Sequence, residues 1–327
     1  YFDAGGLFVV RMSALFSLVT FHTYLPVAIF FSIFSFSGLW ALFKTVVKIY
    51  PGLYKQLAIA IFFLPSVFFW GSGLLKDSLT LGALGWLIYS FYNFFFDRKK
   101  LILSVIIMFL SGYILFTVKS YIILSILPAL IIWLFLTYKD KIRSKLLRII
   151  STPVILAMAF FLIIYGTINL AAETEKFSHE EIISTAQYQA YHLKKQSMGM
   201  ASYYAIGEIS GIGSIIINAP KAVFIALFRP FLWEVRNPVM LLSALECTFF
   251  LLLTISIIWK LGFLKFFQII NKEPYVIAAL LFTLIFSVGI GLTSGNFGTL
   301  VRYKIPMLPF FLSSLFIIRS YALPQRH

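Results

Sequence analysis

Long apolar runs separated by short basic connections are the feature that most restricts how this chain can fold. A membrane-crossing helix needs roughly 20 apolar residues, and the sequence offers about nine such runs. They occupy residues 24–43, 56–71, 78–96, 101–118, 120–137, 149–171, 238–259, 275–292 and 305–318. Two of them, 56–71 and 305–318, are short enough to be tilted or broken. The chain is therefore predicted to be all-α, a polytopic integral membrane helix bundle of about nine transmembrane helices (eight to ten).

The composition excludes a soluble fold. Hydrophobic residues make up 61% of the chain and charged residues only 12%, whereas soluble domains are about one quarter charged. We expect a single transmembrane domain over residues 1–327, and the first residue, Tyr1, indicates that the natural N-terminus lies further upstream. Residues 4–21 form one more apolar stretch, interrupted by Arg11. It is either an amphipathic helix at the membrane surface or a tenth span.

Basic residues in the connections predict the orientation of the chain. Of the 27 lysines and arginines, 16 lie in one alternating set of connections, and such an excess marks the cytoplasmic side. The short connections opposite contain only four basic residues, Lys76, Lys119, Arg302 and Lys304. The one long connection, residues 172–237, then lies outside. We predict it to be an extracytoplasmic loop that contains amphipathic helices.

The net charge of +15 does not predict nucleic-acid binding, because basic residues of membrane proteins serve orientation and headgroup contact. The sequence contains no H-E-x-x-H, Walker A or G-x-S-x-G motif, and its four histidines are scattered. Cys247 is the single cysteine, and we interpret it as a small apolar filler within a helix. No metal and no cofactor are therefore predicted.

The first polar segment covers residues 71–78 and follows an apolar run that Pro65 interrupts. A helix is predicted to restart near Lys76, and a helix N-terminus beside a lysine can bind an anion. The alternative is an ordinary turn, with Asp77 as a first-turn cap and Lys76 extending to the headgroups. Lys119 stands alone between two spans and is a second candidate cation on the outer side.

A third polar segment, residues 227–238, combines aromatic side chains with Arg229 and Arg236. Glu246 follows within the next predicted span, eight residues past Pro238 and so roughly 12 Å along a helix. An ionisable residue at that depth costs roughly 2.5–3.5 kcal/mol to insert, so it should face a cavity or a partner. Glu246 is thus either a functional carboxylate or a protonated, hydrogen-bonded structural one.

A fourth polar segment, residues 294–306, is a glycine-punctuated turn that leads into a short helix with Arg302 and Lys304. Arginine holds phosphate and carboxylate groups with two parallel hydrogen bonds, whereas lysine acts as a point charge. Both are candidates for binding an anionic group. Gly291 and Gly295 form a G-x-x-x-G pair, which we interpret as close helix packing or a turn.

The basic residues of these segments are predicted to converge on the outer membrane face, where they oppose the orientation rule. The set comprises Lys76, Lys119, Arg229, Arg236, Arg302 and Lys304. A phosphate or pyrophosphate headgroup would explain such a cluster. The rival explanation is internal pairing with acidic residues, which would make the cluster structural. The acids available for it are Asp77, Glu208, Glu234 and Glu246.

Three segments carry a resemblance to known proteins. Residues 230–246 match the pattern PFxWE…LxxLE, residues 296–310 match NxGxxxRYxxPxxPF, and residues 71–78 look like WSSGxxKD. These patterns recur in uncharacterised polytopic membrane proteins of bacterial polysaccharide clusters, which the chain resembles loosely over most of its length. Such proteins are similar in plan to O-antigen-polymerase-like proteins and to GT-C-type glycosyltransferases. The resemblance implies a multi-pass protein of the bacterial inner (cytoplasmic) membrane, with residues 172–237 on the periplasmic side.

We therefore expect an inner-membrane glycosyltransferase or polysaccharide polymerase that acts on polyprenyl-phosphate-linked glycans at the outer face. The basic residues would hold the diphosphate, and Glu246 or Asp77 would serve as the base. The alternatives are a transporter or flippase for an anionic lipid or glycan, and a non-catalytic subunit of a larger membrane assembly. The expected partners are membrane lipid and a polyprenyl-phosphate-linked sugar, and not nucleic acid.

Overall fold

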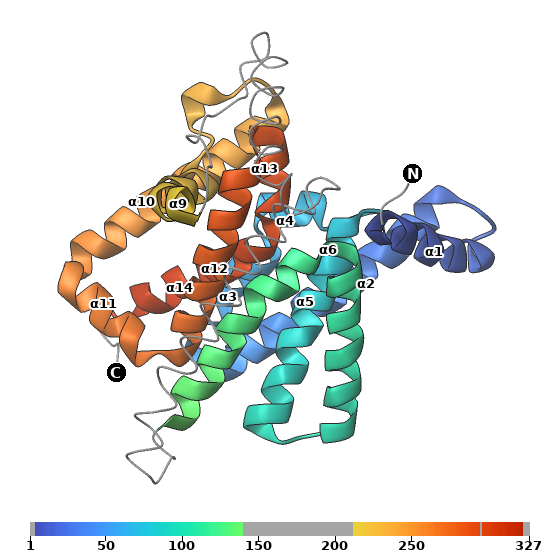
Figure 1. Cartoon of the computed structure of the whole chain (residues 1–327), viewed down its shortest axis with the longest axis horizontal. Helices are drawn as coiled ribbons and strands as arrows, with labels where there is room; N and C mark the ends of the chain where they lie inside the picture. The colour runs from blue at the N-terminus through green and yellow to red at the C-terminus, as the bar shows by residue number, and fades with distance from the viewer. Residues whose placement is uncertain (1–3, 140–211, 295, 323–327) are drawn as a thin grey trace. The chain divides into compact units, whose positions relative to one another are not determined.

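A computed structural model describes residues 4–139, 212–294 and 296–322 of the chain. The elements within these ranges are all helices, with no β-strand among them, which confirms the predicted all-α class (Figure 1). The predicted span at 149–171, and the part of the predicted outer loop up to residue 211, lie outside the described residues. The chain divides into two compact units, Tyr1–Ile123 and Leu124–His327.

The first unit contains five complete helices and the beginning of a sixth. They are α1 (Ala4–Val19), α2 (Tyr24–Ile49), α3 (Tyr54–Phe62), α4 (Pro65–Trp70), α5 (Lys76–Tyr92) and α6 (Leu101–Tyr138). A 3₁₀ turn, Pro51–Leu53, precedes α3, and a π-helical turn, Asn93–Asp97, extends α5.

Close packing of α2 against α5 forms the centre of this unit, and glycine makes it possible. A Cβ atom added to Gly38 would lie 2.0 Å from the backbone oxygen of Gly82, and one added to Gly85 would lie 1.9 Å from that of Gly38. No side chain fits at such separations. The two backbones therefore touch directly, as small residues allow between membrane helices.

The predicted span at 56–71 is broken, as its proline indicates. The helix α3 ends at Phe62, Leu64 is extended, and Pro65 occupies the first turn of α4. The chain then turns at Gly73, whose φ of +100° is a conformation that other residues rarely adopt. That turn leads into α5.

The predicted spans 101–118 and 120–137 are joined in the single element α6, which is interrupted at Lys119. This residue has φ −151° and ψ 82°, outside the helical region. The interruption falls at the boundary that the sequence predicts, between two apolar runs. Lys119 therefore sits where the helical hydrogen-bond ladder is broken.

Within its described residues, the second unit contains the remainder of α6 and six further helices. They are α9 (Ile212–Phe228), α10 (Pro238–Leu261), α11 (Phe263–Lys272), α12 (Pro274–Thr293), α13 (Phe297–Tyr303) and α14 (Leu308–Ser320). Two 3₁₀ turns, Leu232–Glu234 and Ile305–Met307, precede α10 and α14 respectively.

The centre of the second unit is α14, whose residues from Leu308 to Ile318 are all buried. A helix that is apolar on every side must be surrounded by others. The Phe311 ring packs edge-on against Phe250 of α10 and Phe228 of α9, with centroids 5.7 and 6.2 Å away. On α12, Gly291 lets the backbone approach Ala222 of α9, as the interpretation of close helix packing expects.

Six helical segments are long and apolar enough to cross a membrane among the residues that the structure describes. They are Tyr24–Ile49, Lys76–Asp97, Leu101–Tyr138, Met240–Leu261, Pro274–Thr293 and Phe297–Ser320. The number differs from the predicted nine because α3 and α4 are short, α6 counts once and 149–171 is not described. The helices α1 and α9 are apolar but shorter. The chain has the architecture of a multi-pass membrane protein.

Candidate functional site

A buried ion pair joins two of the predicted site residues in the first unit. The Lys119 ammonium lies 2.5 Å from Oδ1 of Asp77, and both side chains are buried. Asp77 lies in the first turn of α5, where a carboxylate also interacts favourably with the helix dipole. Lys119 reaches it from the break in α6. The predicted cation and the predicted base are therefore each other's partners.

The turn before α5 is held by its own hydrogen bonds. The Gly73 N–H donates to Oγ of Ser32 over 2.8 Å, and the Ser78 hydroxyl donates to the Gly73 carbonyl over 2.7 Å. Lys76, beside Asp77, is half-buried. In this unit the arrangement favours the structural explanation, because the acid that would balance Lys119 is already in contact with it.

In the second unit, Arg229 and Glu234 close a turn between α9 and α10. The Arg229 guanidinium donates two hydrogen bonds to the Glu234 carboxylate, through Nε and Nη2. The Phe231 N–H donates to Oε2 of Glu234 over 2.8 Å. The Arg229–Pro230 peptide within this turn is cis. Burial opposes ionisation of Glu234, but these hydrogen bonds and the Arg229 charge outweigh it, so the pKa of Glu234 is lowered.

Aromatic rings surround the same arginine. The Arg229 guanidinium carbon lies 4.9 Å from the centre of the Phe297 ring and 5.9 Å from that of Phe231, both within cation–π range. Phe231 in turn stacks on Trp233 with centroids 4.6 Å apart. Trp233 is 79% exposed, so this aromatic stack continues from the half-buried arginine out to the surface.

Lys304 is fully buried directly beside this turn. Its ammonium donates to Sγ of Cys247 over 2.8 Å and to the Arg229 carbonyl over 3.3 Å. Phe297 and Lys304 are seven residues apart, two helical turns, so they share one side of the α13 segment. No carboxylate in the described ranges lies within ion-pair distance of Lys304. Among the described residues, the cation contacts a thiol and a carbonyl, neither of which carries a full negative charge.

The other predicted residues of this unit differ in their burial and in their position relative to Lys304. Glu246 is buried in α10 and directly precedes Cys247. Arg302 is half-buried on α13, five residues after Phe297 and hence on a different side of that helix. Arg236 is exposed and lies two residues before Pro238, outside the helix α10. The structure thus brings Arg229 and Lys304 together and leaves Arg236 at the surface.

Cys247 was not predicted to be part of this cluster. The interpretation of Cys247 as a buried helix residue is right, but its sulfur is one of the two groups that hold Lys304. Nothing in the local sequence marks this role, since the two residues are 57 positions apart. Within the described ranges, no group of histidine, cysteine, aspartate and glutamate is arranged to hold a metal ion.

The fold and the cluster define a multi-pass α-helical membrane protein with a buried cationic centre in its C-terminal unit. Comparison with known proteins adds no closer relationship, because no family model, no curated protein and no solved structure matches the chain.

Proposed function

We propose that the chain is a glycosyltransferase or polysaccharide polymerase of a bacterial inner membrane that acts on polyprenyl-phosphate-linked glycans at the outer face. The single observation that carries the proposal is the fully buried ammonium of Lys304, with no carboxylate at ion-pair distance in the described part of the chain. A buried charge is costly unless it is compensated. An anionic substrate group is the compensation that we propose.

The diphosphate of a lipid-linked sugar fits this role. Lys304 would supply a fixed positive potential from within the bundle, where a low dielectric strengthens it. Arg302 is half-buried on a different side of α13, so we assign it the direct contact with the phosphate oxygens, through its long side chain and planar fork. The exposed Trp233, stacked on Phe231, offers an aromatic face for a sugar ring or a prenyl chain.

Glu246 is the carboxylate that we assign as general base. It is buried next to Cys247, in the same unit as the cations, whereas Asp77 is already paired with Lys119. In the proposed step, the acceptor hydroxyl gives its proton to Glu246 and its oxygen forms a bond to the anomeric carbon. The bond from that carbon to the diphosphate oxygen breaks, and the diphosphate leaves with the electron pair. Positive charge at Arg302 and Lys304 stabilises the leaving group as its charge develops.

The proposal is tested with the full chain in nanodiscs, by comparing polyprenyl diphosphate with the uncharged polyprenol as ligands. We expect the diphosphate to bind at least about tenfold more tightly, a difference of about 1.4 kcal/mol. Arg302→Lys keeps the charge and loses the fork, so it should weaken this binding markedly. Lys221→Gln removes an exposed lysine of α9 and serves as the control, with binding unchanged. Equal binding of polyprenol and diphosphate would refute an anion site.

Catalysis is tested separately by elongation of a radiolabelled lipid-linked oligosaccharide in the same nanodiscs. Glu246→Gln preserves shape and hydrogen bonding while removing the charge, so transfer should stop while diphosphate binding remains. Full transfer by Glu246→Gln would remove the residue from the mechanism. Diphosphate binding without transfer in the unsubstituted chain would instead indicate a carrier or flippase that uses the same cations.

A further inference from the structure

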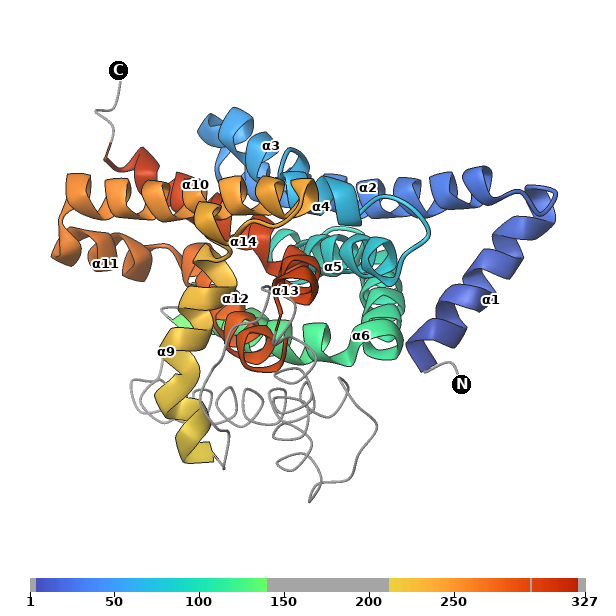
Figure 2. The same cartoon turned by 90° about the horizontal axis from the view of Figure 1, so that it is seen from above.

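A short amphipathic helix, α11, connects the ends of two membrane-spanning helices at one side of the second unit. Gly262, with φ +75°, ends α10 and donates its N–H to the Ile258 carbonyl over 2.8 Å. Pro274 then begins α12 and stops α11. Figures 1 and 2 show α11 turning back from the end of α10 and leading into α12.

The length of α11 fixes its place relative to a bilayer. Its 10 residues span about 15 Å, half of the roughly 30 Å that a hydrocarbon core requires. Because α10 and α12 each cross the membrane, the helix that joins them must lie at the face where the first ends and the second begins. The helix α11 is therefore an interfacial helix.

Its side chains divide into three sectors around the helix axis. Ile269 is 4% exposed and, with the half-buried Phe266, packs on the unit. The second sector is apolar but exposed and consists of Phe263, Leu264 and Phe267, of which Leu264 is 78% exposed. The third sector is polar.

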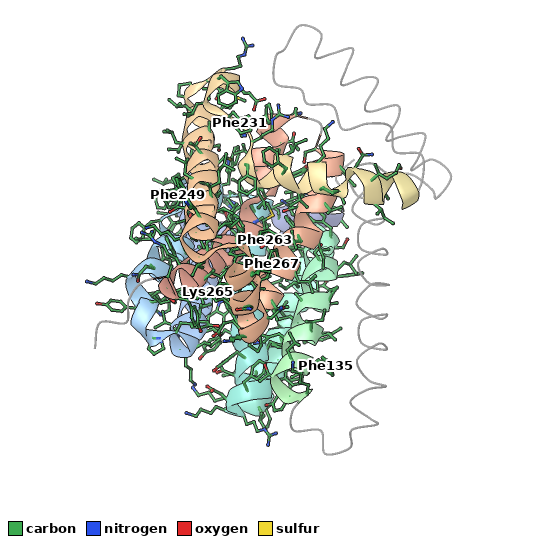
Figure 3. The ribbon with its side chains drawn as sticks, turned by 90° about the vertical axis from the view of Figure 1, so that its left-hand side faces the viewer. Phe135, Phe231, Phe249, Phe263, Lys265 and Phe267 are labelled. Carbon is green, nitrogen blue, oxygen red and sulfur yellow. The ribbon has the colours of Figure 1, made fainter. Side chains whose placement is uncertain are left out.

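The polar sector contains two exposed lysines, Lys265 and Lys272, which are seven residues apart and so lie on the same side of the helix. Figure 3 views the unit from the side of α11 and labels Phe263, Lys265 and Phe267 on this helix. Apolar rings and lysines on neighbouring sides of one exposed helix are the pattern of a segment that lies in the headgroup region.

The surroundings of α11 add to its positive charge. At the end of α10, Trp259 is 86% exposed and is followed by the exposed Lys260. Tryptophan at such a position is typical of the membrane interface. The single acid from Cys247 to Ser294 is Glu273, and its carboxylate accepts a hydrogen bond from the Tyr321 hydroxyl. Burial and this bond to the carboxylate raise the pKa of Tyr321 to about 12, with the bond as the larger cause.

From this arrangement we infer that α11 binds anionic phospholipid headgroups. Phe263, Leu264 and Phe267 enter the boundary of the acyl chains, and Lys265 and Lys272 contact lipid phosphates beside them. The charge of the segment distinguishes this occupant from a zwitterionic lipid, because three lysines stand against one acid that already has a hydrogen-bond partner. The inference does not depend on the proposed enzymatic function.

The depth of the helix is tested with a fluorescent label on Leu264→Cys in nanodiscs that contain lipids carrying a quencher near the headgroup or deep in the acyl chain. The label should be quenched more strongly by the shallow lipid. Phe249→Cys is the matched control, since Phe249 is exposed near the middle of α10 and should be quenched by the deep lipid (Figure 3). The native Cys247 is buried, and the unsubstituted chain gives its background labelling.

Two outcomes of this measurement, and a third in combination with the lysine experiment below, would overturn the inference. No quenching of the Leu264→Cys label would indicate that another protein or a second copy of the chain covers α11. Deep quenching equal to that at Phe249→Cys would indicate an inserted helix. Shallow quenching together with an unchanged phosphatidylglycerol enrichment in both lysine variants of the experiment below would indicate a surface helix without an anionic site.

The lysines are tested by the enrichment of phosphatidylglycerol over phosphatidylcholine in lipid that co-purifies with the full chain. Each of Lys265→Gln and Lys272→Gln should lower the enrichment about fivefold, because a lysine near an anionic surface contributes about that factor. Lys55→Gln, an exposed lysine of α3, is the control and should leave the enrichment unchanged. An equal loss from Lys55→Gln would show that general basic charge is responsible, and would refute a site on α11.

Discussion

Two buried lysines, Lys119 in the first unit and Lys304 in the second, are compensated in opposite ways. Lys119 lies 2.5 Å from the carboxylate of Asp77, so charge is balanced within the protein. Lys304 is held by the sulfur of Cys247 and the carbonyl of Arg229, which solvate a cation without neutralising it. Both lysines belong to the cluster that the sequence predicts, but only the first has its counterion among the described residues at ion-pair distance.

The difference separates a structural cation from a candidate functional one. A buried ion pair that is complete gains nothing from an external anion, and binding one would require separating the charges first. A buried cation that lacks a carboxylate is a site where an anion lowers the free energy of the protein itself. Substituting the same residue type at both positions tests this distinction.

The largest effect is expected from Lys119→Met. The substitution leaves Asp77 buried without its cation, and breaking a buried ion pair typically costs about 3–5 kcal/mol. The loss should lower the melting temperature of the detergent-solubilised chain by on the order of 10 °C. Thermal denaturation followed by size-exclusion chromatography provides the measurement.

The double variant Asp77→Leu with Lys119→Met is the control for this first prediction. It replaces both charges by apolar side chains of similar size, so the melting temperature should return to within a few degrees of that of the unsubstituted chain. If the double variant is as unstable as Lys119→Met, the stability at this position comes from packing and not from the ion pair.

The second prediction is that Lys304→Met, unlike Lys119→Met, has a small effect on stability and a large effect on ligand binding. Among the described residues, no carboxylate lies at ion-pair distance from Lys304, so the substitution leaves no buried acid without its counterion. The methionine side chain is apolar, has a similar length and fills the same space. Stability should therefore change by less than about 1 kcal/mol. Binding of polyprenyl diphosphate in nanodiscs should fall at least about tenfold. A loss of stability as large as that of Lys119→Met would place Lys304 with the structural cations.

Much of the fold follows from the length of the apolar runs. The helices α2, α5, α10 and α12 begin and end within a few residues of their predicted spans, except that α2 continues to Ile49. Pro65 predicts the break between α3 and α4, and Lys119 falls at the predicted boundary within α6. The amphipathic α11 was not predicted, because its lysines lie in a short stretch between two spans and have the pattern of a basic connection.

The candidate site was predicted as a set of residues but not as a set of contacts. Asp77 and Lys119 are 42 residues apart, and only the packed bundle brings them together. The Arg229–Glu234 pair spans five residues and was foreseen only as one of several structural pairings. The contact of Lys304 with Cys247 has no sequence signal of its own, because cysteine in a membrane helix usually packs as a small apolar residue.

The third prediction has the smallest expected effect and concerns the Arg229–Glu234 pair. This ion pair is complete, as that of Lys119 is, but it is partly exposed, so we expect it to contribute less to stability than the buried pair. The pKa of Glu234 is lowered from its ordinary value of 4.5, despite partial burial, by the hydrogen bonds from Arg229 and the Phe231 N–H. A carboxylate whose pKa is lower in the folded state stabilises that state fully above its ordinary pKa. This stabilisation is lost as the pH falls through the lowered value. Partly exposed pairs contribute up to about 1 kcal/mol.

Glu234→Gln should therefore lower the melting temperature by a few degrees at pH 7 and by progressively less as the pH falls below 4.5. Thermal denaturation of both chains between pH 7 and pH 3 provides the measurement, and Glu273→Gln serves as a control carboxylate in the same unit. If the melting temperatures of Glu234→Gln and the unsubstituted chain differ by the same amount at every pH in this range, the turn is held by packing and not by the charge of Glu234.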